Sequence, residues 1–178
     1  MKNDTTIPLI FLNLDILCTQ SGQEYHLRTS NETHDLDGQK FCPRSIEGLD
    51  KIIQTYNAEL VLLDPWLDST ESISNIKKLF SNRKLKWKVR DLNINSKKGI
   101  PRGKSIELWM KKHGTPERFV IIDDNADFDI TPYFPGKTVN TNNVEGLADK
   151  RCYRRTNSII KHIQLIEPSI VSKIKSVF

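Results

Sequence analysis

The feature that most constrains the fold is a repeated alternation between short apolar runs and stretches of helical periodicity. Three runs are apolar enough for buried strands: Pro8–Leu14, Ala58–Leu63 and Phe119–Ile122. Between them, apolar residues recur at the spacing of amphipathic helices, as in the segment that Pro43 opens. This alternation predicts an α/β fold with a largely parallel sheet, because parallel strands need crossover connections and helices cover both of their faces.

The other segments complete this pattern and define one domain over residues 1–178. Leu85–Leu92 alternates apolar and charged residues, which predicts a strand with one face in water. We expect three layers around a central, mostly parallel sheet of about five strands. Residues 20–40 are polar and rich in turn formers, which indicates a small cap-like insertion over the strand ends. The remaining expected elements are helices from Pro43, after Ser69 or Thr70, over Pro101–His113 and over 156–178, and a short strand at Thr138-Val139.

Composition excludes several other classes of protein. No apolar run reaches the ~18 residues of a membrane span, and the run after Asp4 is too short for a signal peptide. Cys18, Cys42 and Cys152 show neither metal-binding spacing nor the pattern of a disulfide framework. We therefore expect a cytoplasmic protein with reduced thiols and no membrane contact.

The positive charge is unevenly distributed along the chain. The net charge is +5, and residues 77–112 hold thirteen Lys and Arg against two acidic residues, Asp91 and Glu107. Such a stretch attracts nucleic acid or a phosphorylated small molecule, although an ordinary solvated surface explains it about as well. A smaller basic cluster, Tyr153-Arg154-Arg155, is typical of a solvated face.

Carboxylates follow two of the expected strands. Asp15 comes just after the first strand, and Asp123 and Asp124 follow the Phe119–Ile122 strand. Ligands of open α/β sheets bind at the carboxyl ends of the strands. Three carboxylates meeting there repel one another unless a hard cation lies between them, and an oxygen-only set suits Mg²⁺. The alternative, that these are ordinary turn residues, is about equally favoured by the pattern.

The order of these segments resembles the haloacid-dehalogenase-like (HAD) superfamily, and in particular the small HAD domains associated with Swiss Army knife RNA-repair proteins. The resemblance implies a three-layer Rossmann-like fold and a Mg²⁺-dependent phosphohydrolase. It places Asn13 at the nucleophile position and Asp15 as general acid and base. The segments that carry the resemblance are IFLNLDILCT (10–19), AELVLLDPW (58–66), PRGKSIELWM (101–110), FVIIDDNADFD (119–129) and VNTNNVEGL (139–147).

The same resemblance assigns the remaining site residues. Arg102 or Lys104 would neutralise the phosphate, and Asp15, Asp123 and Asp124 would hold the metal. Two positions depart from the family pattern. Asn13 replaces the nucleophilic aspartate, and Leu63-Asp64 stands where the family has a phosphate-binding Ser or Thr.

These departures leave two functions open. The first is a HAD-like phosphatase of a phosphate ester, such as a nucleotide or a nucleic-acid end, impaired because an amide is a very poor nucleophile. The second is a catalytically silent pseudoenzyme that binds a phosphorylated ligand, a nucleic acid or a protein partner. An engineered Asp→Asn change would also explain Asn13, but the departure at Leu63-Asp64 favours natural loss.

Overall fold

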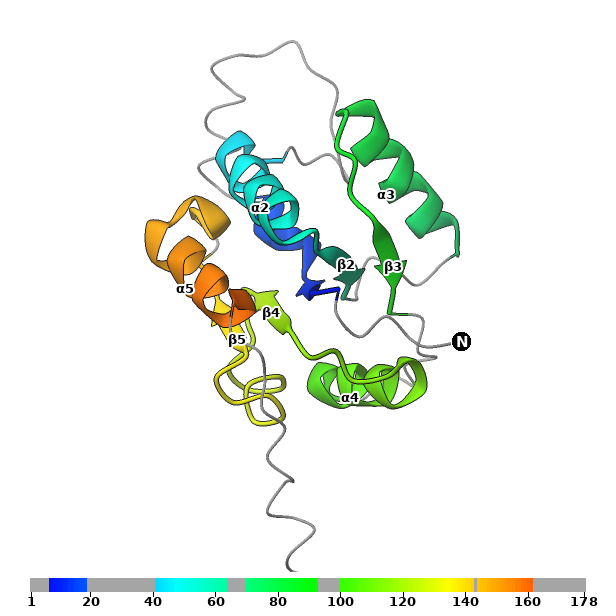
Figure 1. The fold of residues 1–178 in the computed structure, drawn as a ribbon, viewed down its shortest axis with the longest axis vertical. Helices are drawn as coiled ribbons and strands as arrows, with labels where there is room; N and C mark the ends of the chain where they lie inside the picture. The colour runs from blue at the N-terminus through cyan, green and yellow to red at the C-terminus, as the bar shows by residue number, and fades with distance from the viewer. Residues whose placement is uncertain (1–6, 19–40, 64–69, 93–99, 143, 162–178) are drawn as a thin grey trace, which may run out of the picture.

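The computed structural model describes residues 7–18, 41–63, 70–92, 100–142 and 144–161 of the 178-residue chain (Figure 1). The expected insertion at 20–40, Asp64 and the chain after residue 161 lie outside these residues. Among the described residues, no helix combines the length and the apolar character needed to cross a membrane. The elements are β1 (Leu9–Leu12), η1 (Leu14–Leu17), α2 (Pro43–Tyr56), β2 (Glu59–Leu62), α3 (Thr70–Asn82), β3 (Val89–Asp91), α4 (Arg102–His113), β4 (Phe119–Asp123), β5 (Thr138–Asn140), η2 (Gly146–Ala148) and α5 (Lys150–Lys161).

The described strands form one five-stranded sheet in the order β3-β2-β1-β4-β5, and all of its pairs are parallel. This confirms the expected α/β class. Leu12 at the end of β1 is in register with Leu62 of β2 and with Ile122 of β4. The carboxyl ends of these strands therefore lie at the same edge. The strand order reverses between β1 and β4, where α/β sheets of this kind have their binding crevice.

Helices cover both faces of the sheet, which gives three layers. Ile10 and Leu12 of β1 pack on one face in a cluster that includes residues of α2, α3 and α5. Leu9 and Phe11 point to the other face, where the cluster includes residues of α4. Figure 1 shows the same division, with α4 on the opposite side of the sheet from α2 and α5. Every residue of β1 is buried, as the apolar run predicted.

Two elements differ from their expected bounds. Strand β3 covers only Val89–Asp91 of the expected Leu85–Leu92. Trp87, upstream of it, packs its ring against Phe80 at 4.9 Å, and its Nε1 donates a hydrogen bond to Asp50 at 2.7 Å. This tertiary contact replaces strand pairing there. Helix α5 begins at Lys150 rather than near Thr156. Its first turn is basic and carries little apolar periodicity, so the sequence pattern did not indicate this earlier start.

Candidate functional site

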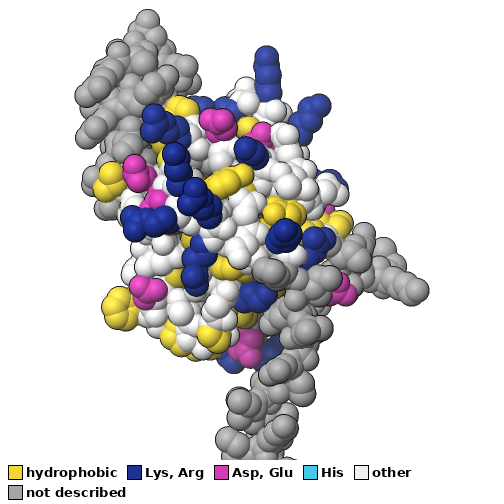
Figure 2. All heavy atoms as spheres, turned by 60° about the vertical axis from the view of Figure 1, so that its left-hand side comes forward, with side chains coloured by type: hydrophobic (Ala, Val, Ile, Leu, Met, Phe, Trp, Pro, Cys, Tyr) yellow, Lys and Arg dark blue, Asp and Glu magenta, His cyan; other side chains and the backbone are white. Residues whose placement is uncertain are grey.

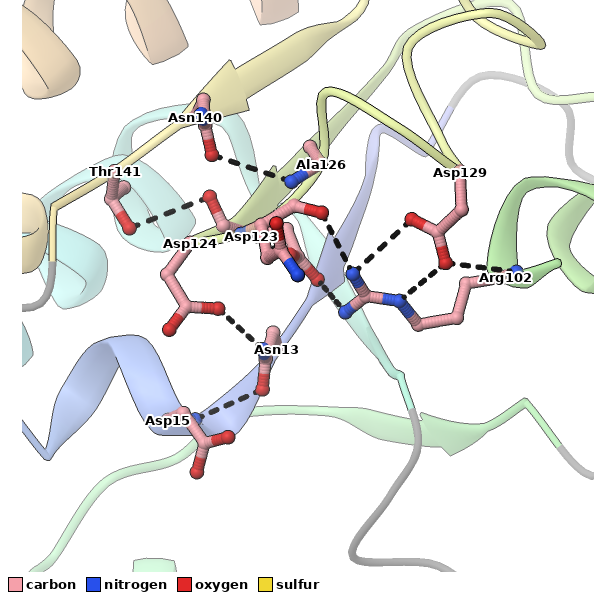
Figure 3. Close-up of polar contacts among 10 residues, drawn as sticks. Asn13, Asp15, Arg102, Asp123, Asp124, Ala126, Asp129, Asn140 and Thr141 are labelled. Atoms are coloured by element: carbon pink, nitrogen blue, oxygen red, sulfur yellow. Dashed lines mark hydrogen bonds and ion pairs between the residues drawn. The ribbon is translucent and has the colours of Figure 1, made fainter.

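Asn13 lies directly after β1, at the carboxyl edge of the sheet, and is 3% exposed. Its backbone N–H donates to the carbonyl of Ile122 at 3.0 Å, which fixes it beside the end of β4. Its side-chain Nδ2 donates to Oδ1 of Asp124 at 3.0 Å, and its Oδ1 accepts from the backbone N–H of Asp15 at 3.1 Å (Figure 3). The second bond caps η1. The structure thus brings two of the expected site residues, Asn13 and Asp124, into direct contact.

Asp123, the last residue of β4, is fully buried, and both of its carboxylate oxygens are used by protein donors. Oδ1 accepts from the backbone N–H of Asn125 at 2.7 Å. Oδ2 accepts from Nη1 of Arg102 at 2.6 Å. A buried carboxylate needs such partners because an unpaired charge in the interior is very costly. As placed, Asp123 holds Arg102 rather than offering oxygens to a metal.

Arg102 begins α4 and makes a second, bidentate ion pair with Asp129. Its Nε lies 3.0 Å from Oδ2 and its Nη2 lies 3.2 Å from Oδ1 of that carboxylate (Figure 3). Nη2 also donates to the carbonyl of Asn125 at 2.9 Å. The guanidinium is therefore anchored at the sheet edge by two carboxylates and one carbonyl, a geometry that its planar fork fits and a lysine does not.

Burial and neighbouring charges both shift the pKa values of Asp123 and Arg102. Burial raises the pKa of Asp123, and the charges of Asp124 and Asp129 raise it further, outweighing the Asn125 N–H bond and Arg102. For Arg102, burial alone would lower the pKa, but the hydrogen bonds that it donates to Asp129 and the charges of Asp123 and Asp129 raise it overall. Arg102 therefore carries its positive charge at every physiological pH.

Gly103 allows Asp129 to reach Arg102. Its backbone N–H donates to the Asp129 carbonyl at 3.0 Å. A Cβ at this position would lie 2.5 Å from that carbonyl oxygen and 2.5 Å from Cδ2 of Tyr133. The loop after β4 can rest on the first turn of α4 only because residue 103 has no side chain. Sequence reasoning did not single out Asp129; its place within the acidic FVIIDDNADFD segment was the one available signal.

The other expected phosphate-binding cation, Lys104, is paired elsewhere. Its Nζ lies 2.6 Å from Oε2 of Glu107, one turn along α4. The hydrogen bond and charge of Glu107 raise the pKa of Lys104, and the same bond lowers the pKa of Glu107. Of the two candidates, Arg102 is the one that the described structure places at the edge with Asp123.

The three expected metal ligands do not converge. Asp15 lies in η1, and its carboxylate points away from Asp124 (Figure 3). Within the described ranges, no three His, Cys, Asp or Glu side chains gather as a complete metal site would require. The Asp124 carboxylate accepts from the Asn13 amide at 3.0 Å and is an oxygen ligand of the kind that suits Mg²⁺. As placed, it is not joined by the carboxylate of Asp15.

Two further expectations concern the surroundings of the site. Leu63 after β2 is fully buried, and its N–H donates to the carbonyl of Leu12 at 2.9 Å, so an apolar side chain follows this strand.

The described part of the basic stretch 77–112 is divided between the two sides of the sheet, with α3 on one and α4 on the other. Several of its cations are paired: Lys88 and Arg90 with Glu59, and Lys104 and Lys111 with Glu107.

Comparison with known proteins identifies the family. No curated protein matches the chain. No solved structure matches it either. The model of one protein family, the HAD domain in Swiss Army Knife RNA repair proteins, matches residues 9–152 of the chain. This range runs from β1 into α5 and includes every site residue described above. The chain therefore belongs to the family of HAD domains found in Swiss Army Knife RNA repair proteins.

Proposed function

We propose that this chain is a phosphohydrolase-type HAD domain that binds a phosphate ester at the carboxyl ends of β1 and β4 but transfers the phosphoryl group poorly or not at all. The observation that carries the proposal is the position of Asn13. Its amide is buried at the nucleophile position, bonded to Asp124 on one side and to the Asp15 N–H on the other. An amide has a single, neutral oxygen and lacks the anionic carboxylate oxygen that attacks phosphorus. Asn13 therefore cannot form the acyl phosphate that an aspartate would form.

The other residues keep roles that suit phosphate chemistry. Arg102 supplies a permanent positive charge for the phosphate oxygens, and Asp123 and Asp129 hold its guanidinium in place. Asp15 is the expected general acid and base. Asp124 would hold Mg²⁺, joined by Asp15 after rotation of its side chain, and the ion would neutralise phosphate charge. Asp123, also expected among the metal ligands, serves in this proposal to position Arg102.

A nucleotide or nucleic-acid end is the substrate class we favour. The family occurs in RNA repair proteins. In addition, Phe128 is 87% exposed and directly precedes Asp129, which binds Arg102. An exposed aromatic ring beside a phosphate site offers a surface on which a base can stack. Stacking would favour an ester with an aromatic base over a sugar phosphate.

The second candidate function is a pseudoenzyme that binds a phosphorylated ligand without turnover. It is favoured by the buried Leu63 after β2, because an apolar side chain there provides no hydroxyl for the phosphoryl oxygens. A lost hydrogen bond to a charged acceptor removes about 1.5–3 kcal/mol of binding. Restoring the nucleophile alone would then leave the site inactive.

The test compares Mg²⁺-dependent phosphate release by the parent chain and by Asn13→Asp. The substrates are an aryl phosphate, a nucleoside monophosphate, a 5′-phosphorylated oligonucleotide and a hexose phosphate. We expect turnover only in Asn13→Asp, and loss of that turnover in the double variant Asn13→Asp/Asp15→Asn. If the folded single variant releases no phosphate from any substrate, the phosphohydrolase proposal is wrong and the pseudoenzyme reading replaces it.

A further inference from the structure

The solvent-facing side of α5 is strongly basic. The helix carries five basic residues and no acidic residue: Lys150, Arg151, Arg154, Arg155 and Lys161. All five are exposed. At about 100° per residue, they fall within an arc of about 140°. The opposite side of the helix is apolar and contributes Ile160 to the core, where it is fully buried.

Most of this charge is not neutralised within the described part of the chain. Among the described residues, α5 makes an ion pair between Arg151 and Asp149 at 3.8 Å, and the Arg151 side chain is 92% exposed. Arg155 donates to the carbonyl of Thr138 at 3.2 Å, which leaves its charge uncompensated. Lys150 and Arg151 also lie in the first turn, where the helix dipole disfavours cations. A bound anion would relieve this repulsion.

Neighbouring elements do not cancel the excess. Figure 2 shows this side of the molecule, with Lys and Arg side chains gathered across it and fewer acidic ones among them. Helix α2 packs beside α5 and contributes both signs, with Arg44 and Lys51 against Glu47 and Asp50. On the η2 side the acidic residues are Glu145 and Asp149. The net positive charge of the surface therefore comes from α5.

Hydrogen bonds connect the first turn of α5 to the candidate site. Cys152 in its first turn contacts the carbonyl of Asn140, at the end of β5, through Sγ at 3.8 Å. The Asn140 side chain in turn accepts from the N–H of Ala126 at 3.3 Å and donates to Asp127 at 2.9 Å. Asn140 thus links α5 to the loop that follows Asp123 and Asp124. A strand lying along α5 can reach the carboxyl edge of the sheet.

We propose that the exposed side of α5 binds the phosphodiester backbone of a nucleic acid. Its cations extend over about 16 Å of helix, and the dense, regular charge of a nucleic acid matches such a row. A membrane surface fits less well, because interfacial helices expose an apolar face and that of α5 is buried. The proposal goes beyond the proposed function, since binding along α5 requires neither turnover nor an intact nucleophile.

The test is fluorescence anisotropy of a labelled 20-nucleotide RNA, and of the same DNA sequence, without Mg²⁺ and over a range of salt concentrations. The variant is Arg151→Glu/Arg154→Glu. The matched control is Lys77→Glu/Lys78→Glu, which makes the same charge change at two exposed positions of α3. Circular dichroism and thermal melting verify that each variant is folded.

We expect the α5 variant to bind at least tenfold more weakly than the parent at low salt, with a salt slope reduced by about two. The α3 variant should change affinity less than twofold. An equal loss of nucleic-acid affinity in both variants would mean that only the net charge of the protein matters, and it would overturn the proposal. Absence of binding by the parent at low salt would overturn it as well. Equally tight binding of poly-glutamate by the parent would assign the surface to an acidic protein instead. Because no turnover is measured, these outcomes are separate from those of the Asn13→Asp assay.

Discussion

At the scale of single residues, Asn13 uses both ends of its side-chain amide. It donates to Asp124 at 3.0 Å and accepts from the Asp15 N–H at 3.1 Å, and an aspartate could make only the second bond. We predict that Asn13→Asp destabilises the protein in EDTA by about 2 kcal/mol, because a charge-assisted hydrogen bond is lost and two carboxylates face each other. That corresponds to a decrease of roughly 4–8 °C in Tm for a domain of this size.

Magnesium should reverse part of this loss. A divalent cation between the new carboxylate and Asp124 removes their repulsion, so Mg²⁺ should raise the Tm of Asn13→Asp by several degrees more than that of the parent. Asn13→Ala is the control, since it also loses the bond to Asp124, together with the bond from the Asp15 N–H, but adds no charge. Thermal melting with and without Mg²⁺ gives the comparison. Equal Mg²⁺ responses of the two variants would show that no cation binds there.

The site residues differ in how far the sequence could predict them. Asn13, Asp123 and Asp124 follow apolar runs, and a parallel sheet aligns the ends of such runs, so their meeting at one edge was predictable. The pairing of Arg102 with Asp129 was not. It depends on the path of the loop after β4 and on the missing side chain of Gly103, and residue spacing encodes neither. Lys104 stands only two positions from Arg102, yet helix geometry turns it toward Glu107.

Arg102 and Lys104 should therefore differ sharply in their contribution to stability. Arg102→Met leaves the fully buried Asp123 without its cation, and removing one partner of a buried pair costs about 3–5 kcal/mol. Lys104→Met removes an exposed ion pair with Glu107, which water screens, and should leave stability nearly unchanged. Urea unfolding of the two variants measures both. Similar losses would mean that Asp123 does not depend on Arg102 for its charge.

At the scale of elements, the start of α4 is set by contact with the loop after β4 rather than by helix propensity. Replacing a glycine inside a helix by alanine normally stabilises it by up to about 1 kcal/mol. We predict the opposite for Gly103→Ala, a loss of about 1–3 kcal/mol, because the added Cβ would lie 2.5 Å from the Asp129 carbonyl and from Tyr133. The measurement is urea unfolding, with Ser81→Ala on the exposed side of α3 as control. Stabilisation by Gly103→Ala would show that the loop does not pack on α4.

The elements that the sequence predicted best are those whose local pattern agrees with their packing. Strand β1 and helix α2 carry continuous apolar and strictly periodic signals, and both lie where these signals indicated. Strand β3 is shorter than its alternating pattern suggested, because Trp87 is buried against Phe80 and Asp50, and neither contact is local. The first turn of α5 carries Lys150 and Arg151 and only the partly buried Cys152 and Tyr153 as apolar residues, so its later part was easier to predict.

At the scale of the whole molecule, the folding unit extends beyond the range that matches the family. The match ends at residue 152, within α5, but the core does not. Ile160 is fully buried and belongs to the same cluster as Leu12, Ile52 and Ile122, which come from β1, α2 and β4. The last turns of α5 thus close the face of the sheet on which α2 and α3 also lie. The basic outer side of α5 is held in place by this buried inner side.

This arrangement gives a final prediction. Ile160→Ala should reduce the free energy of unfolding by about 2–4 kcal/mol, because it leaves a cavity in a core shared by strands and helices. Ser158→Ala, on the exposed side of the same helix, should change it by less than about 0.5 kcal/mol. Urea unfolding of both variants measures these two changes in the free energy of unfolding. If Ile160→Ala reduced the free energy of unfolding as little as Ser158→Ala, α5 would be only loosely packed on the core. Any nucleic acid bound along it would then be poorly positioned relative to Asn13 and Asp124. A large loss instead establishes α5 as a rigid part of the domain, able to hold a strand in fixed register with the carboxyl edge of the sheet.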